Sequence, residues 1–466
     1  MDQVTVGLDI GTTSTKAVAV DAAGTVLRRA RITHGVVVPA PDRMEHDADR
    51  AWRRGPLRAL AALGDVQPVA LAVTSMMPSV TAVDAKGRPM TAGLLYGDSR
   101  GRSGPAISAL AEGGPGTSGA EVAGFLSWAA SQVPDAHGYW PAQAVANRAL
   151  GAAPAVDMIV AFIAAPIYGP DGWDPDLCAA CGVRPDQLPT VDAPGAPVGR
   201  LGGGAEGPIV AAGTADVWCE HLVAGVGAAG DVHVVLGSTL IVWAIDNAAA
   251  TGEPHPGLWS VPLGDPNLKM VGGASNAGGL FLDWAGRLVG SRGRRREAER
   301  VDPADVPVWV PYPRGERTPY HDPYRRAALH EINLGHGPAA IERAAWEATG
   351  FVVRHHLDLS AAPAKRIVAT GGGTQVAGLV EALAYTTGLP VHVASDPEGA
   401  ARGAAFVARH AAGLETNFDD ARRWASTGRV VEPDPTWSNH ANLRYQRFLE
   451  LSGPPSRPQP IAEAPA

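Results

Sequence analysis

The chain has few cysteines, no long apolar run and no excess of positive charge, and each absence excludes a class of protein. Three cysteines in 466 residues cannot form a disulfide framework, which favours a reducing compartment such as the cytoplasm. No apolar run reaches the roughly 18–20 residues that span a membrane, and acidic residues near the start argue against a signal peptide. A net charge of −8 argues against a nucleic-acid-binding surface. We therefore expect a cytoplasmic protein without membrane or nucleic-acid partners.

Two common nucleotide-binding motifs are absent or out of context. No G-x-x-x-x-G-K-[ST] segment occurs, which argues against a P-loop enzyme. Two G-x-G-x-x-G matches begin at Gly202 and Gly225, but neither leads from a strand into a helix, so a Rossmann site is not expected. Cys178 and Cys181 form a C-x-x-C motif without a second pair, which favours two small buried residues over a zinc site.

What is present favours two domains built on one plan. A chain of 466 residues exceeds what one hydrophobic core usually organises. Residues 4–20, VTVGLDIGTTSTKAVAV, predict a β-hairpin, and residues 232–245, VHVVLGSTLIVWAI, predict a second one. Strands alternating with helices indicate an α/β architecture. We expect domains at 1–229 and 230–451, followed by a disordered tail at 452–466.

The turn of the first hairpin carries the chemistry of a polyphosphate site. Gly11 lets backbone N–H groups approach a ligand closely, and Thr12 and Thr13 add hydroxyl donors. Lys16 adds a positive charge, and Asp9 suits the Mg²⁺ that accompanies a polyphosphate. The alternative is an ordinary β-hairpin with a glycine turn.

The turn of the second hairpin repeats the pattern at Gly237, Ser238 and Thr239. Val235 stands where the first hairpin has Asp9. Two such loops facing each other across a cleft would clamp one polyphosphate, and only one of them would hold a metal ion. The asymmetry favours one bound Mg²⁺–nucleotide over two equivalent sites.

Residues 210–227 predict a short strand followed by a helix that begins near Asp216. A carboxylate at such a junction beside a cleft takes the proton of an attacking hydroxyl group. Phosphoryl transfer needs little more than alignment, a metal ion, charge neutralisation and a residue that orients the nucleophile. In the alternative interpretation, Asp216 only caps the helix.

Three further segments are candidates for substrate contacts. Asp98 and Arg100 lie two residues apart at the end of a predicted strand, so both would point to one side and bind vicinal sugar hydroxyls. A surface salt bridge or a turn is the alternative. Residues 369–375, ATGGGTQ, and 270–279, MVGGASNAGG, offer bare backbone to an adenine or ribose, or are loops of small residues with a packing role only.

Taken in order, these motifs resemble the FGGY family of carbohydrate kinases, within the actin-like sugar kinase superfamily. The matching segments, from Val4 to about Gly413, are DIGTTSTKA, LLYGDSR, AAGTADVWCEHLVAGVG, LGSTL, GGASNAGG, VPYPRGERTPYHDPYRR, ATGGGTQ and PEGAARGAAFVA. The resemblance implies two ribonuclease-H-like (actin-like ATPase) domains that close on ATP, Mg²⁺ and a sugar and thereby exclude water. It leaves a homodimer open.

The resemblance also implies roles for individual residues. Asp216 corresponds to the catalytic base and, with Asp9, to the residues that hold Mg²⁺. The residues in substrate-binding segments are Met76, Met77, Asp98 and Arg100. The residues in phosphate and nucleotide loops are Gly11, Thr12, Thr13, Lys16, Gly237, Ser238, Thr239, Gly273, Gly372, Gly373 and Gln375.

One segment departs from the family pattern. Xylulose kinases carry Gln-Met-His-Gly where this chain has Ser75-Met76-Met77-Pro78, so an amide and an imidazole that bind sugar hydroxyls are missing. The sequence predicts an ATP-dependent kinase for a ketopentose such as D-xylulose or a related polyol. The alternative is a catalytically silent sugar- or nucleotide-binding paralogue with a regulatory role. Intact Asp9 and Asp216 argue against that alternative.

Overall fold

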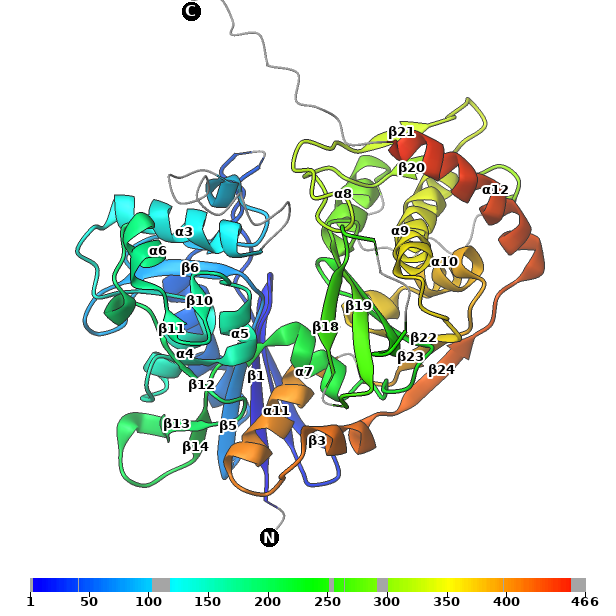
Figure 1. Cartoon of the computed structure of the whole chain (residues 1–466). Coiled ribbons are helices and arrows are strands. Elements are labelled where there is room, and N and C mark those ends of the chain that lie inside the picture. Colours follow the sequence, from blue (N-terminus) through cyan, green and yellow to red (C-terminus); the bar gives the residue numbers. More distant parts are fainter. Residues whose placement is uncertain are drawn as a thin grey trace, which may run out of the picture. The chain divides into compact units, whose positions relative to one another are not determined.

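The computed structural model describes residues 3–40, 42–102, 118–250, 255–263, 265–290, 301–396 and 398–453 (Figure 1). The chain divides into two compact units. Unit 1 comprises Met1–Gly225 and Glu398–Ser426, and unit 2 comprises Val226–Pro397 and Thr427–Ala466. Both units combine a large sheet with flanking helices, which confirms the predicted α/β architecture.

Unit 1 is built on a seven-stranded sheet whose centre is the predicted first hairpin. The strands follow the order β13 (Pro197–Arg200), β14 (Ile209–Ala211), β5 (Ala70–Ser75), β1 (Thr5–Ile10), β2 (Ser14–Val20) and β3 (Val26–Thr33), and the short β15 (Thr214–Ala215) pairs with the end of β5. Strand β5 runs parallel to β1, and every residue of both strands is buried. Two parallel neighbours buried in this way are typical of a sheet that is covered on both faces.

A smaller antiparallel sheet forms the rest of unit 1. Its four strands are β4 (Glu45–His46), β7 (Gly93–Leu95), β6 (Ser79–Val83) and β8 (Gly138–Trp140). Helices α3 (Ser118–Gln132) and α4 (Ala142–Ala149) pack against β6 and β8. The other elements are α1 (Gly55–Ala61), α5 (Met158–Phe162), α6 (Pro175–Ala180), the two-stranded pairs β9 (Ala155–Asp157) with β12 (Thr190–Asp192) and β10 (Tyr168–Gly169) with β11 (Gly172–Trp173), and single-turn helical segments.

Helix α11 (Gly399–Ala411) corrects the predicted domain boundary. Figure 1 shows this orange helix beside the blue strand β1, and it packs against β1, β2, β5 and α7 (Asp216–Leu222). A Cβ atom on Gly7 would overlap the backbone oxygen of Ala401, so the contact is close. Residues 398–426 therefore belong to unit 1, whereas the sequence-based boundary placed them in the second domain. The helical pattern shows that α11 is buried but not which sheet covers it.

Unit 2 repeats the plan of unit 1. Its seven strands follow the order β18 (Trp259–Pro262), β19 (Leu268–Ser275), β17 (Leu240–Asn247), β16 (Asp231–Leu236), β22 (Arg366–Thr370), β23 (Val391–Ala394) and β24 (Thr427–Val431). In both sheets, an antiparallel hairpin is followed on one side by a third antiparallel strand and on the other by a parallel strand. The prediction of two related hairpins is confirmed.

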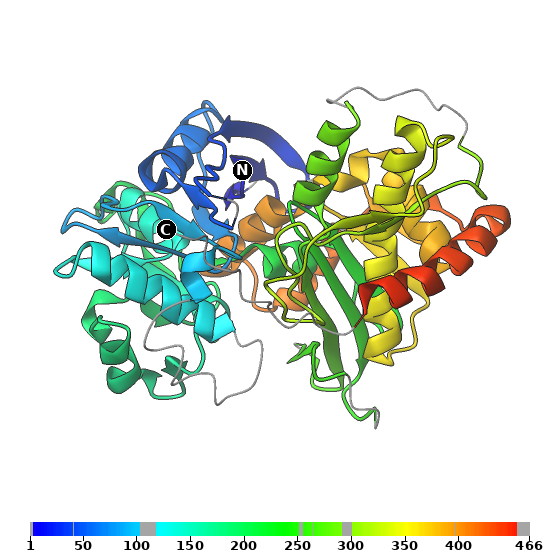
Figure 2. The same cartoon turned by 90° about the horizontal axis from the view of Figure 1, so that it is seen from above.

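The helices of unit 2 gather over this sheet (Figure 2). Helix α9 (Pro338–Ser360) lies against β17 and β19, while α10 (Ala377–Thr387), α12 (Pro435–Ser452) and α8 (Gly279–Leu288) pack against α9. Strands β20 (Val308–Val310) and β21 (Ala328–His330) form a separate pair. The predicted tail starts inside α12 at Ser452, and residues 454–466 lie outside the described residues. In the described ranges, no helix is both long and apolar enough to cross a membrane.

Candidate active site

The first part of the site is the turn between β1 and β2 in unit 1. The Gly11 N–H donates a hydrogen bond of 3.0 Å to the carbonyl oxygen of Ser14 and closes the turn. The Thr12 side chain is buried, and its hydroxyl lies 2.8 Å from the hydroxyl of Tyr96. Thr13 is exposed. Thr12 therefore anchors the turn, whereas Thr13 presents its hydroxyl to solvent.

A buried histidine, His46, holds this turn in place through a hydrogen bond. His46 Nε2 donates to the Thr12 carbonyl oxygen at 2.7 Å, and His46 Nδ1 accepts from the Trp52 indole N–H at 2.9 Å. Burial lowers the pKa of His46 to about 4, so the ring is neutral near pH 7. The two hydrogen bonds hold the neutral ring in one tautomer. No local sequence pattern marks His46, because Thr12, whose carbonyl oxygen it binds, lies 34 residues away in the chain.

Two acidic residues, Asp9 and Asp216, lie at the carboxyl ends of strands of the large sheet. Asp9 lies near the end of β1, and Asp216 directly follows β15. In the sheet register, Thr74 of β5 lies opposite both Asp9 and Thr214, so Asp216 follows the level of Asp9 by two residues. Burial and the nearby negative charge of Asp9 together raise the pKa of Asp216 to about 6. The structure thus places a carboxylate with a raised pKa beside a second carboxylate, a pattern typical of functional sites.

The capping interpretation of Asp216 is wrong. Ala215 occupies the position before α7 and provides no side-chain cap, and Asp216 is the first residue of the helix. The Asp216 carboxylate is oriented by the N–H of the next residue, Val217, at 2.7 Å.

Lys16 compensates part of this negative charge. It faces Asp9 across the hairpin, and its Nζ lies 3.4 Å from Asp9 Oδ2. The charge of Asp9 raises the pKa of Lys16, so the ammonium group stays protonated. The positive charge of Lys16 in turn lowers the pKa of Asp216 and opposes the effect of Asp9.

The donor set in unit 1 fits Mg²⁺ better than a metal held by protein alone. Among the described residues, no group of three or more His, Cys, Asp or Glu side chains is placed to bind a metal ion. Mg²⁺ usually keeps several waters and binds one or two carboxylates together with substrate phosphates. Asp9 and Asp216, which repel each other when both are charged, could supply two such oxygen donors.

The predicted sugar-binding pair is engaged within the protein. Asp98 lies in a turn after β7 and Arg100 in the short helix Ser99–Arg102, so the prediction of a shared strand face is wrong. Arg100 Nη2 donates to Asp98 Oδ2 at 2.7 Å and to Glu45 Oε2 at 2.6 Å. Asp98 also accepts from the Met44 N–H at 2.6 Å. This buried network ties β4 to the segment after β7, and hydroxyl binding by the pair stays a prediction.

The segment after β5 carries the other two predicted substrate contacts. Met76 is buried, and its N–H lies 3.4 Å from the carbonyl oxygen of Ile10. Met77 is half-buried and lines a cavity. The segment that departs from the family pattern therefore adjoins the end of β1.

The turn of the second hairpin lies in unit 2. The Gly237 N–H donates to the Thr239 carbonyl oxygen at 3.1 Å, and Leu236 pairs with Leu240. This turn is one residue shorter than the first, where Ile10 pairs with Thr15. The two loops are therefore related but not identical.

The residues before α8 pack directly on this second turn. The Gly279 N–H donates to the Gly237 carbonyl oxygen at 2.8 Å. A Cβ atom on Gly278 would overlap the backbone of Thr239, so no side chain fits there. Gly273, in contrast, lies inside β19 opposite Val242, and the prediction of a loop over 270–279 is wrong up to Ser275.

Glu316 forms hydrogen bonds with the residues at the end of β19. Its carboxylate accepts from the Ser275 hydroxyl at 2.7 Å and from the Asn276 N–H at 3.0 Å. Burial raises the pKa of Glu316 to about 7. No local sequence pattern indicates a role for Glu316, because only the fold brings it to β19.

The predicted loop Gly371–Gln375 follows β22 in unit 2. Gly371 has a φ of 86°, which favours glycine, and Gly372–Gln375 form a short helical turn. A Cβ atom on Gly373 would lie 2.7 Å from Leu236 Cβ, so this loop packs beside the end of β16. Gly372 and Gln375 are exposed, and a Cβ atom on Gly372 would meet no atom within 4 Å. The backbone at Gly372 is open to a ligand.

Comparison with known families identifies both units of the chain. Residues 4–118 match the N-terminal domain and residues 232–412 the C-terminal domain of the FGGY family of carbohydrate kinases, which together cover more than half of the chain. The chain belongs to this family. It is a carbohydrate kinase that uses ATP to phosphorylate a small sugar-like substrate.

Relatives of this FGGY kinase carry several substrate names. A xylulose kinase of Escherichia coli (strain K12) is 26% identical over 450 residues, covering 89% of this chain and 91% of the relative. A glycerol kinase of Bordetella parapertussis is 26% identical over 508 residues, covering 97% of both chains. The solved xylulose kinase from Rhodospirillum rubrum matches with a TM-score of 0.74 and 26% identity, over 96% of this chain and 98% of its own. These likenesses confirm the two-domain, actin-like fold of the family.

Proposed function

We propose that this FGGY kinase transfers the γ-phosphoryl group of Mg²⁺–ATP to a hydroxyl of a ketopentose such as D-xylulose, or of a related polyol. The observation that carries the proposal is Asp216, a half-buried carboxylate whose pKa is raised to about 6, beside Asp9. A general base works best when its pKa lies near the operating pH. Several relatives are named xylulose kinase, which supports an acceptor of about the size of a ketopentose.

The chain's own residues perform a limited set of tasks in this reaction. Asp216 takes the proton of the acceptor hydroxyl while that oxygen bonds to the γ-phosphorus and the bond to the β-phosphate bridging oxygen breaks, releasing ADP. Mg²⁺, for which Asp9 and Asp216 supply oxygen donors, would neutralise charge on the phosphates. Lys16 and the hydroxyl of Thr13 add positive and hydrogen-bonding groups at the same turn.

Unit 2 supplies the nucleotide contacts in this proposal. The turn Gly237–Thr239 offers N–H and hydroxyl donors to phosphate oxygens. The exposed backbone at Gly372 and the side chain of Gln375 offer contacts to the adenosine part of ATP.

The direct test is an acceptor panel. We expect ADP release, measured by a coupled assay with saturating Mg²⁺–ATP, to be stimulated by at least one member of a set of ketoses, pentitols and glycerol. Release must depend on both the acceptor and Mg²⁺. If no member stimulates release above the ATPase background, the catalytically silent alternative gains and the proposed function fails.

The rate of the enzyme is expected to depend on pH through Asp216. The base acts in its charged form, so kcat/KM should fall about tenfold per pH unit below pH 6 and level off above it. Lys16→Met removes the positive charge that lowers the pKa of Asp216, so the acid limb should move to higher pH. Arg28→Met, at an exposed position of β3, is the control and should leave the limb in place. If the acid limb of kcat/KM stays at the same pH in Lys16→Met, Asp216 is not the group that controls it. This conclusion does not depend on the maximal rate of the variant.

A further inference from the structure

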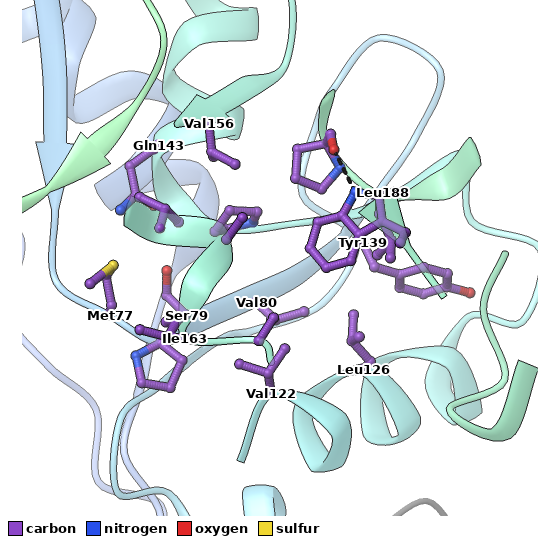
Figure 3. Close-up of a pocket in the computed structure, with 17 residues that line it drawn as sticks. Met77, Ser79, Val80, Val122, Leu126, Tyr139, Gln143, Val156, Ile163 and Leu188 are labelled. Atoms are coloured by element: carbon purple, nitrogen blue, oxygen red, sulfur yellow. Dashed lines mark hydrogen bonds between the residues drawn. The ribbon is translucent and has the colours of Figure 1, made fainter. Parts of the chain in front are cut away.

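Unit 1 contains a mainly aliphatic pocket of about 50 Å³ beside the small sheet. Figure 3 shows Gln143 and Met77 at one end of the pocket and Tyr139 and Leu188 at the other. Because a cavity needs roughly 10–15 Å³ to hold one water molecule, the pocket has room for a group of about four non-hydrogen atoms. Met77 is among several half-buried lining residues.

Most polar atoms around the pocket are already used by the protein. The Ser79 hydroxyl accepts from the Ala142 N–H at 3.1 Å, and the Tyr139 hydroxyl donates to a backbone carbonyl at 2.7 Å. The Trp173 indole N–H donates to the Pro189 carbonyl oxygen at 3.0 Å, which is the dashed line in Figure 3. A ligand with several hydroxyl groups would therefore find few partners here.

Gln143 closes one end of the pocket. Its side chain is fully buried, and its Nε2 donates to the carbonyl oxygens of Ser75 at 3.3 Å and Thr214 at 3.1 Å. Its Oε1 is buried without a hydrogen-bond partner among the described residues. Because Oε1 has almost no accessible surface, a ligand in the pocket does not reach it. The pocket thus offers mainly apolar walls.

The end of the pocket at Gln143 adjoins β15, the strand that directly precedes the candidate base. Thr214, which binds Gln143, lies two residues before Asp216, and two extended residues span at most about 7 Å. Met77 and Pro78 line the same pocket and stand where xylulose kinases carry histidine and glycine.

We propose that this pocket receives an alkyl part of the acceptor, so that the preferred substrate is a polyol or sugar with a short apolar end. The inference rests on the proposed function, because it concerns the alcohol that Asp216 activates. The alkyl carbons of the acceptor lie between Val122, Val156 and Val160. Contact with apolar side chains thereby takes the place of the hydrogen bonds to sugar hydroxyls that the Ser75–Pro78 segment does not provide.

Matched acceptors test this specificity. Each hydroxylated acceptor is compared with an analogue that carries an ethyl group at the far end, for example glycerol with 1,2-pentanediol, by coupled ADP release. Burial of each methylene contributes roughly fourfold in affinity, so kcat/KM for the alkyl analogue should be about tenfold higher or more, mainly through a lower KM.

Filling the pocket should abolish this preference. Val160→Phe places a ring in the pocket, whereas Met158→Phe makes a similar change at an exposed position of the same helix and should keep the preference. Ala164→Val is a smaller filling change, and thermal unfolding of each variant checks that it is folded.

The outcomes separate the two hypotheses. Turnover of hydroxylated acceptors at equal or higher kcat/KM, unaffected by Val160→Phe, overturns the pocket assignment and leaves the proposed function intact. Absence of turnover with every acceptor overturns the proposed function instead. The pocket is then tested by thermal shift with 1,2-pentanediol: stabilisation of the wild type but not of Val160→Phe supports it, and equal shifts overturn it.

Discussion

Asp216→Asn is expected to lower kcat by about 10²–10⁴-fold, the usual contribution of a general base, while ATP binding stays nearly unchanged. The amide has almost the shape of the carboxylate and retains an oxygen that accepts from the Val217 N–H, so α7 should stay in place. What is lost is the group that takes the acceptor's proton. Steady-state ADP release gives kcat, and calorimetric titration gives the affinity for ATP.

A nearby buried aspartate provides the control for this variant. Asp157 accepts hydrogen bonds from the N–H groups of Ile159 and Val160, and burial raises its pKa to about 7. Because a pKa of about 7 leaves this carboxyl partly uncharged at neutral pH, Asp157→Asn should fold and keep kcat within a few-fold. If Asp216→Asn keeps more than a tenth of the wild-type kcat, Asp216 is not the base.

Gly7→Ala is expected to destabilise unit 1 by about 3 kcal/mol or more, at the upper end of the usual cost of overpacking. The new Cβ atom would overlap the backbone oxygen of Ala401, and neither β1 nor α11 has a flexible side chain at the contact that could move away. The helix must therefore shift away from the sheet, and buried contacts of α11 are lost. Denaturant unfolding measures the change.

Gly169→Ala is the matched control, because a Cβ atom on Gly169 would meet no atom within 4 Å. Its effect should stay within about 0.5 kcal/mol, as for most substitutions away from packed sites. A loss below 1 kcal/mol for Gly7→Ala would mean that α11 does not pack on β1. The assignment of residues 398–426 to unit 1 would then be wrong.

Local features of the structure follow well from local sequence. Both hairpins lie where alternating apolar residues and glycine turns predict them, and α10 ends at Gly388, which has a φ of 71°. Each of these features depends on a few consecutive residues, so the pattern contains the information needed.

The segment from Asp98 to Arg100 shows where local patterns fail. A spacing of two predicts a common strand face, but the chain turns after Leu95 and the two side chains bond to each other and to Glu45. Glu45 is distant in the sequence. The Arg100 guanidinium can bind either a ligand hydroxyl or a protein carboxylate. Which of them it binds depends on the groups that the fold places next to it.

The sequence by itself determined that this chain is built from two related α/β halves, with glycine- and hydroxyl-tipped turns and an acidic residue at a strand–helix junction. Only the tertiary structure decided that α11 packs in the first unit, that Tyr96 and His46 hold Thr12, and that Gln143 faces an apolar pocket next to the strand of Asp216. The physical reason is how far apart in the chain the interacting residues lie. Turns and strand patterns are set by neighbouring residues, whereas burial, pKa shifts and pocket polarity arise from side chains that only folding brings into contact.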